Sequence, residues 1–252
     1  VLEELDKFKV GNDTRNYAAK YYYTTSAYDE SVEDMYSYWS QFSLFHQQGN
    51  KKTEINGSWT LGGDTFLFNP LFGANVHNTN VGSVSANHTI AFDGGLQIAF
   101  GAQGGIRSIE STDRGDHTNH SAGLYGILSK SFNNSLRATF SSRIDYDDNF
   151  GVEYLPHLSL AWNPGNFTAR GSAGKAVRGG DFTERYVSYA IPQLSPGRNL
   201  GNPNLNAEKA WSFEVGTDYN TDKGIAGVTM FHRASTDLID YTYTLSDNIT
   251  TA

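Results

Sequence analysis

The stretch Leu136–Tyr146 alternates between apolar and polar residues, and this period of two restricts the fold more than any other feature of the chain. The apolar positions are Leu136, Ala138, Phe140, Ile144 and Tyr146, and the intervening polar positions include Arg137, Thr139, Ser141, Arg143 and Asp145. Successive side chains of a β-strand point to opposite faces, so the segment predicts a strand with one apolar face and one watery face.

The same alternation recurs along most of the chain. It is clear in the segments 54–61, 96–103, 157–163, 167–173 and 211–219. We expect about a dozen strands of about ten residues each. Helical patterning is nearly confined to Val1–Lys9, a short segment without a visible cap. The chain is therefore predicted to be all-β.

The connections between these strands alternate in length. Short turns are expected at 132–135, 164–166 and 221–224, and wider connections at 147–152 and about 175–209. Short hairpins at one end and longer loops at the other are typical of an antiparallel up-and-down transmembrane β-barrel. A soluble β-sandwich would show the same alternation, because one face of each sheet is buried there too.

The charges on the polar face favour the barrel over a filled interior. Arg137, Arg143, Asp145 and Arg170 would all point inward. A buried charge costs several kcal/mol unless it is paired. These side chains suit a polar face that lines a wet lumen, while the apolar face meets lipid.

Composition excludes several classes of function. The chain has no Cys, which excludes a disulfide scaffold, a thiolate metal site and a Cys nucleophile. It has 19 basic and 27 acidic residues, a formal net charge of -8, and so lacks the basic footprint of a nucleic-acid partner.

No catalytic residue, metal site or cofactor is predicted. His117 and His120 are three apart in "DHTNH", a segment that we interpret as a polar loop tip rather than a metal site. His157 and Ser159 would share a strand face, but no oxyanion element or orienting acid accompanies them. We therefore expect a protein that is not an enzyme.

Between Ser121 and Tyr241 the order of landmarks resembles the barrel of TonB-dependent outer-membrane receptors. The landmarks are Arg143-Ile144-Asp145-Tyr146, Pro156, the segment from Arg178 to Tyr186 (RGGDFTERY), Asn202-Pro203-Asn204-Leu205-Asn206-Ala207-Glu208, Glu214 with Gly216, and Asp237-Leu238-Ile239. Two departures are visible, since Ala207 stands where the family usually has Pro and Gly179-Gly180 replace the usual Ala-Pro.

The resemblance implies that residues 1–252 are part of a barrel of about 22 strands, with the strongest match at 121–241 and with the plug domain outside this chain. It implies a bacterial outer-membrane transporter that takes up a ferric siderophore, a corrinoid or a similar scarce chelate. The "DFTERY" form is similar to Bacteroidetes-type receptors, including cobalamin-receptor-like members. The implied partners are the TonB complex, reached through an N-terminal segment not in this chain, outer-membrane lipid or lipopolysaccharide, and a surface lipoprotein lid.

The long connection before residue 209 holds the candidate site. Arg and Tyr suit an anionic, oxygen-rich or flat conjugated ligand, through bidentate hydrogen bonds and stacking. The expected ligand contacts are Arg185, Tyr186, Tyr189, Arg198 and Asn199, and the residues expected to organise the rim and brace the plug are Arg178, Asp181 and Glu184. Two other functions stay open, a secreted soluble β-sandwich that binds glycans and an outer-membrane barrel enzyme.

Overall fold

Antiparallel strands form nearly all of the described chain in this computed structural model. The structure describes residues 32–67, 73–133, 135–192, 199–244 and 249–251. Ten strands form one sheet in which each strand pairs with the next along the chain, except that β10 follows β8 directly. These strands are β1 (Val32–Gln48), β2 (Lys51–Leu67), β3 (Asn75–Phe92), β4 (Leu96–Ser111), β5 (His117–Phe132), β6 (Leu136–Asp147), β7 (Gly151–Trp162), β8 (Phe167–Arg178), β10 (Glu208–Thr221) and β11 (Gly224–Thr236).

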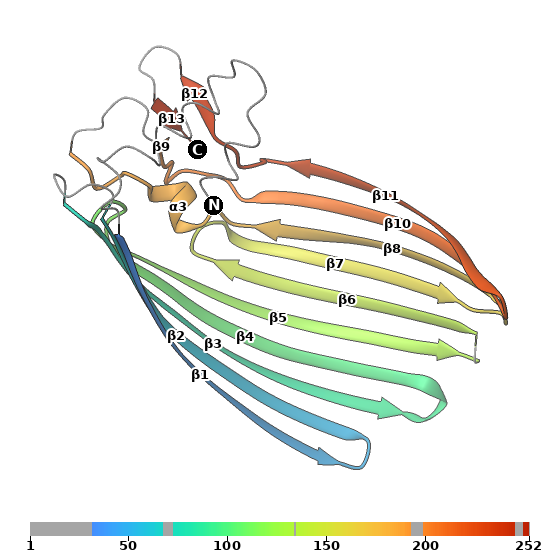
Figure 1. Cartoon of the computed structure of the whole chain (residues 1–252). Coiled ribbons are helices and arrows are strands. Elements are labelled where there is room, and N and C mark those ends of the chain that lie inside the picture. The colour runs from blue at the N-terminus through green and yellow to red at the C-terminus, as the bar shows by residue number, and fades with distance from the viewer. Residues whose placement is uncertain (1–31, 68–72, 134, 193–198, 245–248, 252) are drawn as a thin grey trace.

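The sheet is a single curved layer that runs from β1 to β11 and stays open (Figure 1). Within the described residues, the elements outside it are the 3-10 helix η1 (Asp93–Gly95), the helix α3 (Phe182–Tyr186), β9 (Asn199–Leu200), β12 (Thr242–Thr244) and β13 (Ile249–Thr251). Strands β12, β13 and β9 pair in a small second sheet, which lies with α3 at one end of the long strands (Figure 1). The predicted antiparallel up-and-down architecture is confirmed, as an unclosed part of a barrel.

The predicted strands are present, and most are longer than the pattern indicated. Leu136–Tyr146 forms β6, which continues for one more residue. The segment 167–173 extends to Arg178 as β8. Pairing of β7 with β8 stops at His157, next to Pro156, whose backbone has no N–H to donate. The predicted helix at Val1–Lys9 lies outside the described residues.

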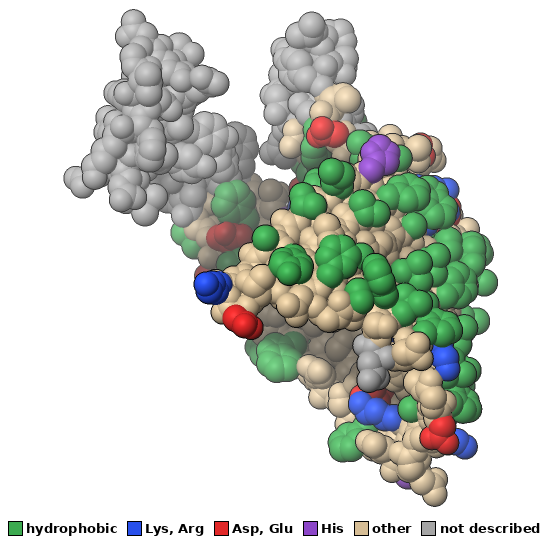
Figure 2. Space-filling model, turned by 90° about the vertical axis from the view of Figure 1, so that its right-hand side faces the viewer, with side chains coloured by type: hydrophobic (Ala, Val, Ile, Leu, Met, Phe, Trp, Pro, Cys, Tyr) green, Lys and Arg blue, Asp and Glu red, His purple; other side chains and the backbone are tan. Residues whose placement is uncertain are grey.

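The two faces of the sheet differ as the alternation predicts. On the apolar face, Phe140 and Ile144 are exposed although both are large hydrophobic residues. Such side chains gather in a band over the face visible in Figure 2. Ile109, Ala207 and Ala210 are the buried hydrophobic residues of the described chain, so the sheet has no packed core of its own. An exposed apolar band of this extent fits contact with lipid.

The polar face gives several of its charged side chains a polar or oppositely charged partner. Arg143 Nε donates to Asp145 Oδ2 at 2.7 Å, and Arg170 pairs with Asp218 across β8 and β10. Arg137 Nε donates to Ser129 Oγ at 3.1 Å. These contacts satisfy the cations without burying them, as a wet lumen requires.

The strand ends sort into a turn end and a rim end. The turn end holds the short hairpins, at 49–50, 93–95, 133–135, 163–166 and 222–223. The rim end holds the connections 68–74, 112–116, 148–150 and 179–207. The wide connection predicted at 147–152 is wrong, because β6 and β7 extend to Asp147 and Gly151 and leave three residues between them. No helix in the described ranges is long and apolar enough to cross a membrane.

Candidate functional site

The connection between β8 and β10 contains α3, a helix of 5 residues with a strong start signal. Asp181 is its N-cap, and the Asp181 carboxylate accepts the backbone N–H of Glu184 at 2.8 Å. The Glu184 carboxylate accepts the backbone N–H of Asp181 in return, also at 2.8 Å. This capping box satisfies two amides that the first turn of a helix leaves unpaired.

Arg178 joins α3 to the strands on either side of it. Its guanidinium donates to both carboxylate oxygens of Glu184, at 3.0 and 2.9 Å. Its Nε donates to Glu208 Oε2 at 2.7 Å, at the start of β10. Glu208 Oε1 accepts the backbone N–H of Ile239 at 2.8 Å. Arg178 and its two acid partners therefore tie β8, α3, β10 and the segment after β11 into one rim.

Arg185 is the buried anchor of this connection. The residue is 4% exposed, and its guanidinium donates to the backbone carbonyls of Pro203 and Leu205, at 2.5 and 2.7 Å. Sequence reasoning assigned Arg185 a direct ligand contact. The geometry favours an organising role instead, because the guanidinium is turned into its own loop and away from solvent.

The Asn-Pro segment packs directly against α3. The Gly201 N–H donates to Val187 O at 2.9 Å, and the Asn202 N–H donates to Glu184 O at 3.0 Å. These two bonds satisfy carbonyls near the end of the helix, which have no partner inside it. The two motifs that carry the family resemblance in this region, at 178–186 and 202–208, are thus one structural unit.

An aromatic cluster lies beside this unit, where α3 meets the polar face of the sheet. Tyr186 stacks on His117 of β5, with ring centroids 3.5 Å apart and planes 10° apart. Phe182 lies 6.4 Å from each of these rings, and the Arg107 guanidinium of β4 lies 6.0 Å from the Phe182 ring centroid. The cluster offers ring faces and a cation together.

Tyr189 extends this cluster toward solvent. It packs edge-on against Tyr186, with ring centroids 6.2 Å apart, and is 55% exposed. We call Arg107, His117, Phe182, Tyr186 and Tyr189 the rim cluster. A stacked ring system with one exposed edge and a neighbouring guanidinium can hold a flat or anionic ligand by stacking and charge.

The predicted site residues are only partly brought together. Tyr186 and Tyr189 lie in the rim cluster, and Arg178, Asp181 and Glu184 form the network beneath it. Asn199 belongs to β9, which pairs in parallel with β13. Arg198 is outside the described residues.

Sequence reasoning missed Arg107 and His117 as site residues. Arg107 is held by Asn119, whose Oδ1 accepts from it at 3.0 Å, and Asn119 in turn donates to Asp147 Oδ1 at 2.9 Å. This chain of contacts crosses three neighbouring strands. Only the strand register, which aligns Arg107 with Asn119, would have revealed it.

His117 and His120 were predicted to lie in a loop tip, and this is wrong. Both belong to β5, and an odd separation on a strand puts the two side chains on opposite faces. His117 joins the rim cluster, whereas His120 Nδ1 lies 2.9 Å from Asp148 Oδ2. In the part of the chain that the structure describes, no group of three His, Cys, Asp or Glu residues could hold a metal ion.

Comparison with known proteins gives a consistent result. A family model described as "TonB dependent receptor-like, beta-barrel" matches residues 4–252. The iron-regulated outer membrane virulence protein of Vibrio cholerae is 33% identical over 107 residues, which are 41% of this chain and 16% of that protein.

Solved structures with the same fold are also receptors. The siderophore receptor PirA from Pseudomonas aeruginosa has a TM-score of 0.75 at 15% identity, over 88% of this chain and 44% of that one. The hemophore receptor HasR of Serratia marcescens has a TM-score of 0.69 at 12% identity, again over 88% of this chain and 44% of that one. The chain thus spans less than half the length of these proteins.

Proposed function

Because this chain belongs to the family of TonB-dependent receptor-like β-barrels, we propose that it forms part of a transporter that takes up a ferric siderophore. The family lies in the bacterial outer membrane, so the apolar face of the sheet meets lipid. The rim end, which carries the longer connections, is the extracellular side. Residues 1–252 would contribute barrel strands, with the plug and the TonB-contacting segment in other parts of the protein.

The rim cluster is the observation that carries the choice of ligand. Its exposed edge at Tyr189 and the half-exposed Arg107 guanidinium suit a ligand that is both aromatic and anionic. Several ferric chelates combine these two properties. The solved relatives include receptors for ferric enterobactin and for a haem-carrying protein, which supports an iron chelate over a corrinoid.

The Arg178 network would serve this site indirectly. We propose that Arg178, Asp181 and Glu184 hold α3 in place and so position Tyr186 and Tyr189 at the mouth of the barrel. In the same proposal, these three residues also contact the plug and brace it. Release of a bound chelate into the periplasm would follow plug rearrangement driven by the TonB complex, without covalent chemistry.

Ligand binding by the full-length receptor in detergent tests the proposal. Quenching of intrinsic fluorescence would be measured with a ferric catecholate siderophore, with haem and with cyanocobalamin. We expect Tyr189→Ala to weaken siderophore binding about two- to twelvefold, because one aromatic contact is worth about 0.5–1.5 kcal/mol.

The matched control is Tyr219→Ala, since Tyr219 is 53% exposed but lies at the turn end of β10. Its binding should be unchanged. If only cyanocobalamin bound tightly, the proposed ligand would be a corrinoid and not a siderophore. An equal loss of siderophore affinity in both variants would show that the rim cluster does not form the binding site.

A further inference from the structure

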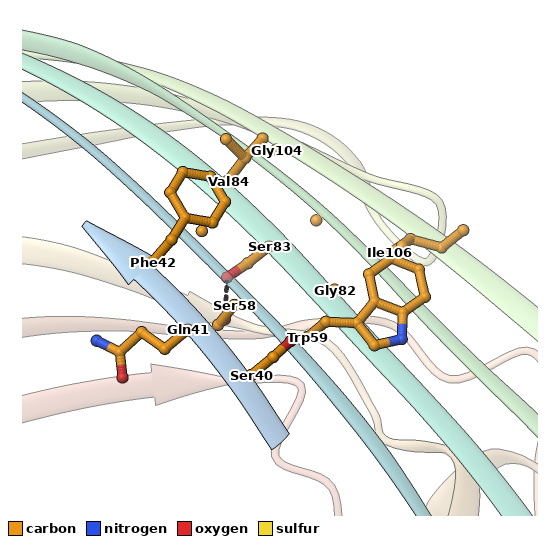
Figure 3. A pocket seen from close by; sticks show the side chains of 12 residues that line it. Ser40, Gln41, Phe42, Ser58, Trp59, Gly82, Ser83, Val84, Gly104 and Ile106 are labelled. Atoms are coloured by element: carbon orange, nitrogen blue, oxygen red, sulfur yellow. Dashed lines mark hydrogen bonds between the residues drawn. The ribbon is translucent and has the colours of Figure 1, made fainter. Parts of the chain in front are cut away.

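Strands β1 to β4 surround a hollow of about 500 Å³ that opens on the apolar face of the sheet (Figure 3). Its walls are Phe42, Trp59, Val84 and Ile106, one side chain from each strand. Figure 3 shows Gln41 directed away from these four side chains. The volume lies within the range of about 300–1,000 Å³ found for ligand pockets.

Glycines create the hollow. Gly57 lies directly across from Phe42, and Gly82 directly across from Trp59. Each ring lies over its glycine so closely that a Cβ atom there would collide with it. Gly104 lies across from Val84, but no ring covers it, and a Cβ at Gly104 would have only Ser121 O nearby, at 3.9 Å. Gly104 therefore forms the uncovered base of the hollow.

The register of the paired strands identifies the residues that share this apolar face along the whole length of β1–β4. Its charged members are Lys51 at the turn end and Asp34 and Glu110 toward the rim end. Lys51 makes no ion pair with a described residue, whereas its neighbour Lys52, on the polar face, pairs with Glu54 at 2.7 Å. The face thus offers a cation on the periplasmic side of the hollow and only acids on the extracellular side.

We propose that the hollow holds the end of one acyl chain of a phospholipid from the periplasmic leaflet, with the phosphate of that lipid at Lys51. The hollow carries no charged side chain, so an acyl chain that enters it covers no charged group of the protein. It is continuous with the lipid-facing band of the sheet. Lys51 matches the phosphate in charge, while Asp34 and Glu110 would repel the phosphates of lipopolysaccharide at the opposite interface.

The distances along the strands suit this placement. Phe42 and Trp59 lie roughly 20–26 Å along their strands from the turn between β1 and β2, at about 3.3 Å per residue. With a strand tilt of about 40°, this is roughly 15–20 Å of depth. The hydrocarbon core of a bilayer is about 30 Å thick. The terminal part of an acyl chain that starts at the periplasmic interface therefore reaches the hollow.

Photo-crosslinking of the full-length receptor tests the site. The protein would be reconstituted in vesicles of phosphatidylethanolamine and phosphatidylglycerol with a trace of phosphatidylglycerol carrying a diazirine near the acyl terminus, and labelled peptides would be identified by mass spectrometry. We expect labelling at the hollow to exceed labelling elsewhere on the apolar face about tenfold, which corresponds to about 1.4 kcal/mol of preference.

Two variants fill a lipid-facing glycine with the same side chain. Gly104→Leu occupies the uncovered base and should abolish the preference for the hollow. Gly126 of β5 lies on the same face of the sheet and also has open space around it, but it is outside the hollow. Gly126→Leu should therefore leave the labelling unchanged. Heat-modifiable migration on a gel verifies that both variants fold.

A second pair of variants tests the head-group contact. Lys51→Glu should lower labelling at the hollow several-fold, and Lys52→Glu, on the opposite face of the same strand, should not. Even labelling around the band, or no difference between Gly104→Leu and Gly126→Leu, would overturn the proposal and leave only general lipid contact. Labelling of the hollow by a diazirine-bearing lipid A but not by the phospholipid would overturn the assignment to the periplasmic leaflet.

Discussion

At the scale of single residues, Gly201 has little freedom to change. A Cβ atom at this position would collide with backbone atoms of Arg185 and Tyr186, which cannot move aside as a flexible side chain could. We expect Gly201→Ala to push the Asn-Pro segment off α3 and to cost about 1–3 kcal/mol, the range for an overpacked site. Thermal unfolding and protease cleavage within 179–207 would measure the effect.

Gly224→Ala is the control for this prediction. Gly224 begins β11 at the turn end, and a Cβ there would meet nothing within 4 Å. This variant should change stability by less than about 0.5 kcal/mol. If the two substitutions were equally tolerated, the packing of the Asn-Pro segment on α3 would not matter for stability.

We expect Asp148, in the turn between β6 and β7, to make the stability of the rim depend on pH. Its carboxylate accepts the backbone N–H of His120 at 2.7 Å and also contacts the His120 ring, and it accepts the Tyr146 hydroxyl at 2.9 Å. These contacts, led by the backbone N–H of His120, lower the pKa of Asp148 below its ordinary value. A carboxyl with a lowered pKa stabilises the folded state above its unfolded pKa of about 4, and this contribution is lost as pH falls further.

Asp148→Asn should therefore weaken the turn at neutral pH but not in acid. Amide hydrogen exchange of the segment around His120, corrected for intrinsic rates, should be faster in the variant at pH 7. The difference from the wild type should disappear as pH falls below about 4. A difference that persists unchanged into acid would mean that the Asp148 carboxylate does not carry the effect.

At the scale of elements, the strands could be predicted because each one alternates on its own. Leu136–Tyr146 needs no partner to reveal its two faces, and β6 has those bounds within one residue. Loop lengths were less predictable, since the turn at 148–150 is closed by contacts from β5, such as the Asp148 N–H that donates to His120 O. The rim cluster could not be predicted as a whole, because Arg107 and His117 meet Phe182 only through strand register and loop folding.

The facing of β10 has a direct test in two adjacent residues. Trp211 is on the apolar face and stacks on Phe213 with ring centroids 6.3 Å apart, while Ser212 lies across from Arg233. We expect Trp211→Asp to cost about 1–2 kcal/mol, from a charge near the lipid interface and a lost aromatic contact. Ser212→Asp, opposite a cation on the polar face, should cost less than about 0.5 kcal/mol.

Refolding into lipid vesicles measures this difference. The folded fraction would be read from heat-modifiable migration over a series of urea concentrations. Equal losses in the two variants, or a larger loss for Ser212→Asp, would reverse the assignment of the two faces of β10.

At the scale of the whole molecule, the sorting of the strand ends determines which parts of the chain each compartment can reach. Short turns lie at one end of the sheet and α3 with the long connection lies at the other (Figure 1). In outer-membrane barrels the short turns are periplasmic. The rim cluster can receive a ligand from outside the cell only if this orientation holds.

Cysteine labelling tests that orientation. These 252 residues contain no Cys, so each cysteine introduced into them is the only one in this part of the barrel, and the receptor without an introduced cysteine serves as the blank. With a maleimide that does not cross the membrane, Tyr189→Cys at the rim should react in intact cells, and Lys223→Cys in the turn between β10 and β11 only after the outer membrane is permeabilised. Val215→Cys, 61% exposed on the apolar face, should react in neither state, because lipid covers it until the protein is denatured. Reaction of Lys223→Cys in intact cells would mean that the barrel has the opposite orientation. The rim cluster would then face the periplasm, where no extracellular chelate could reach it.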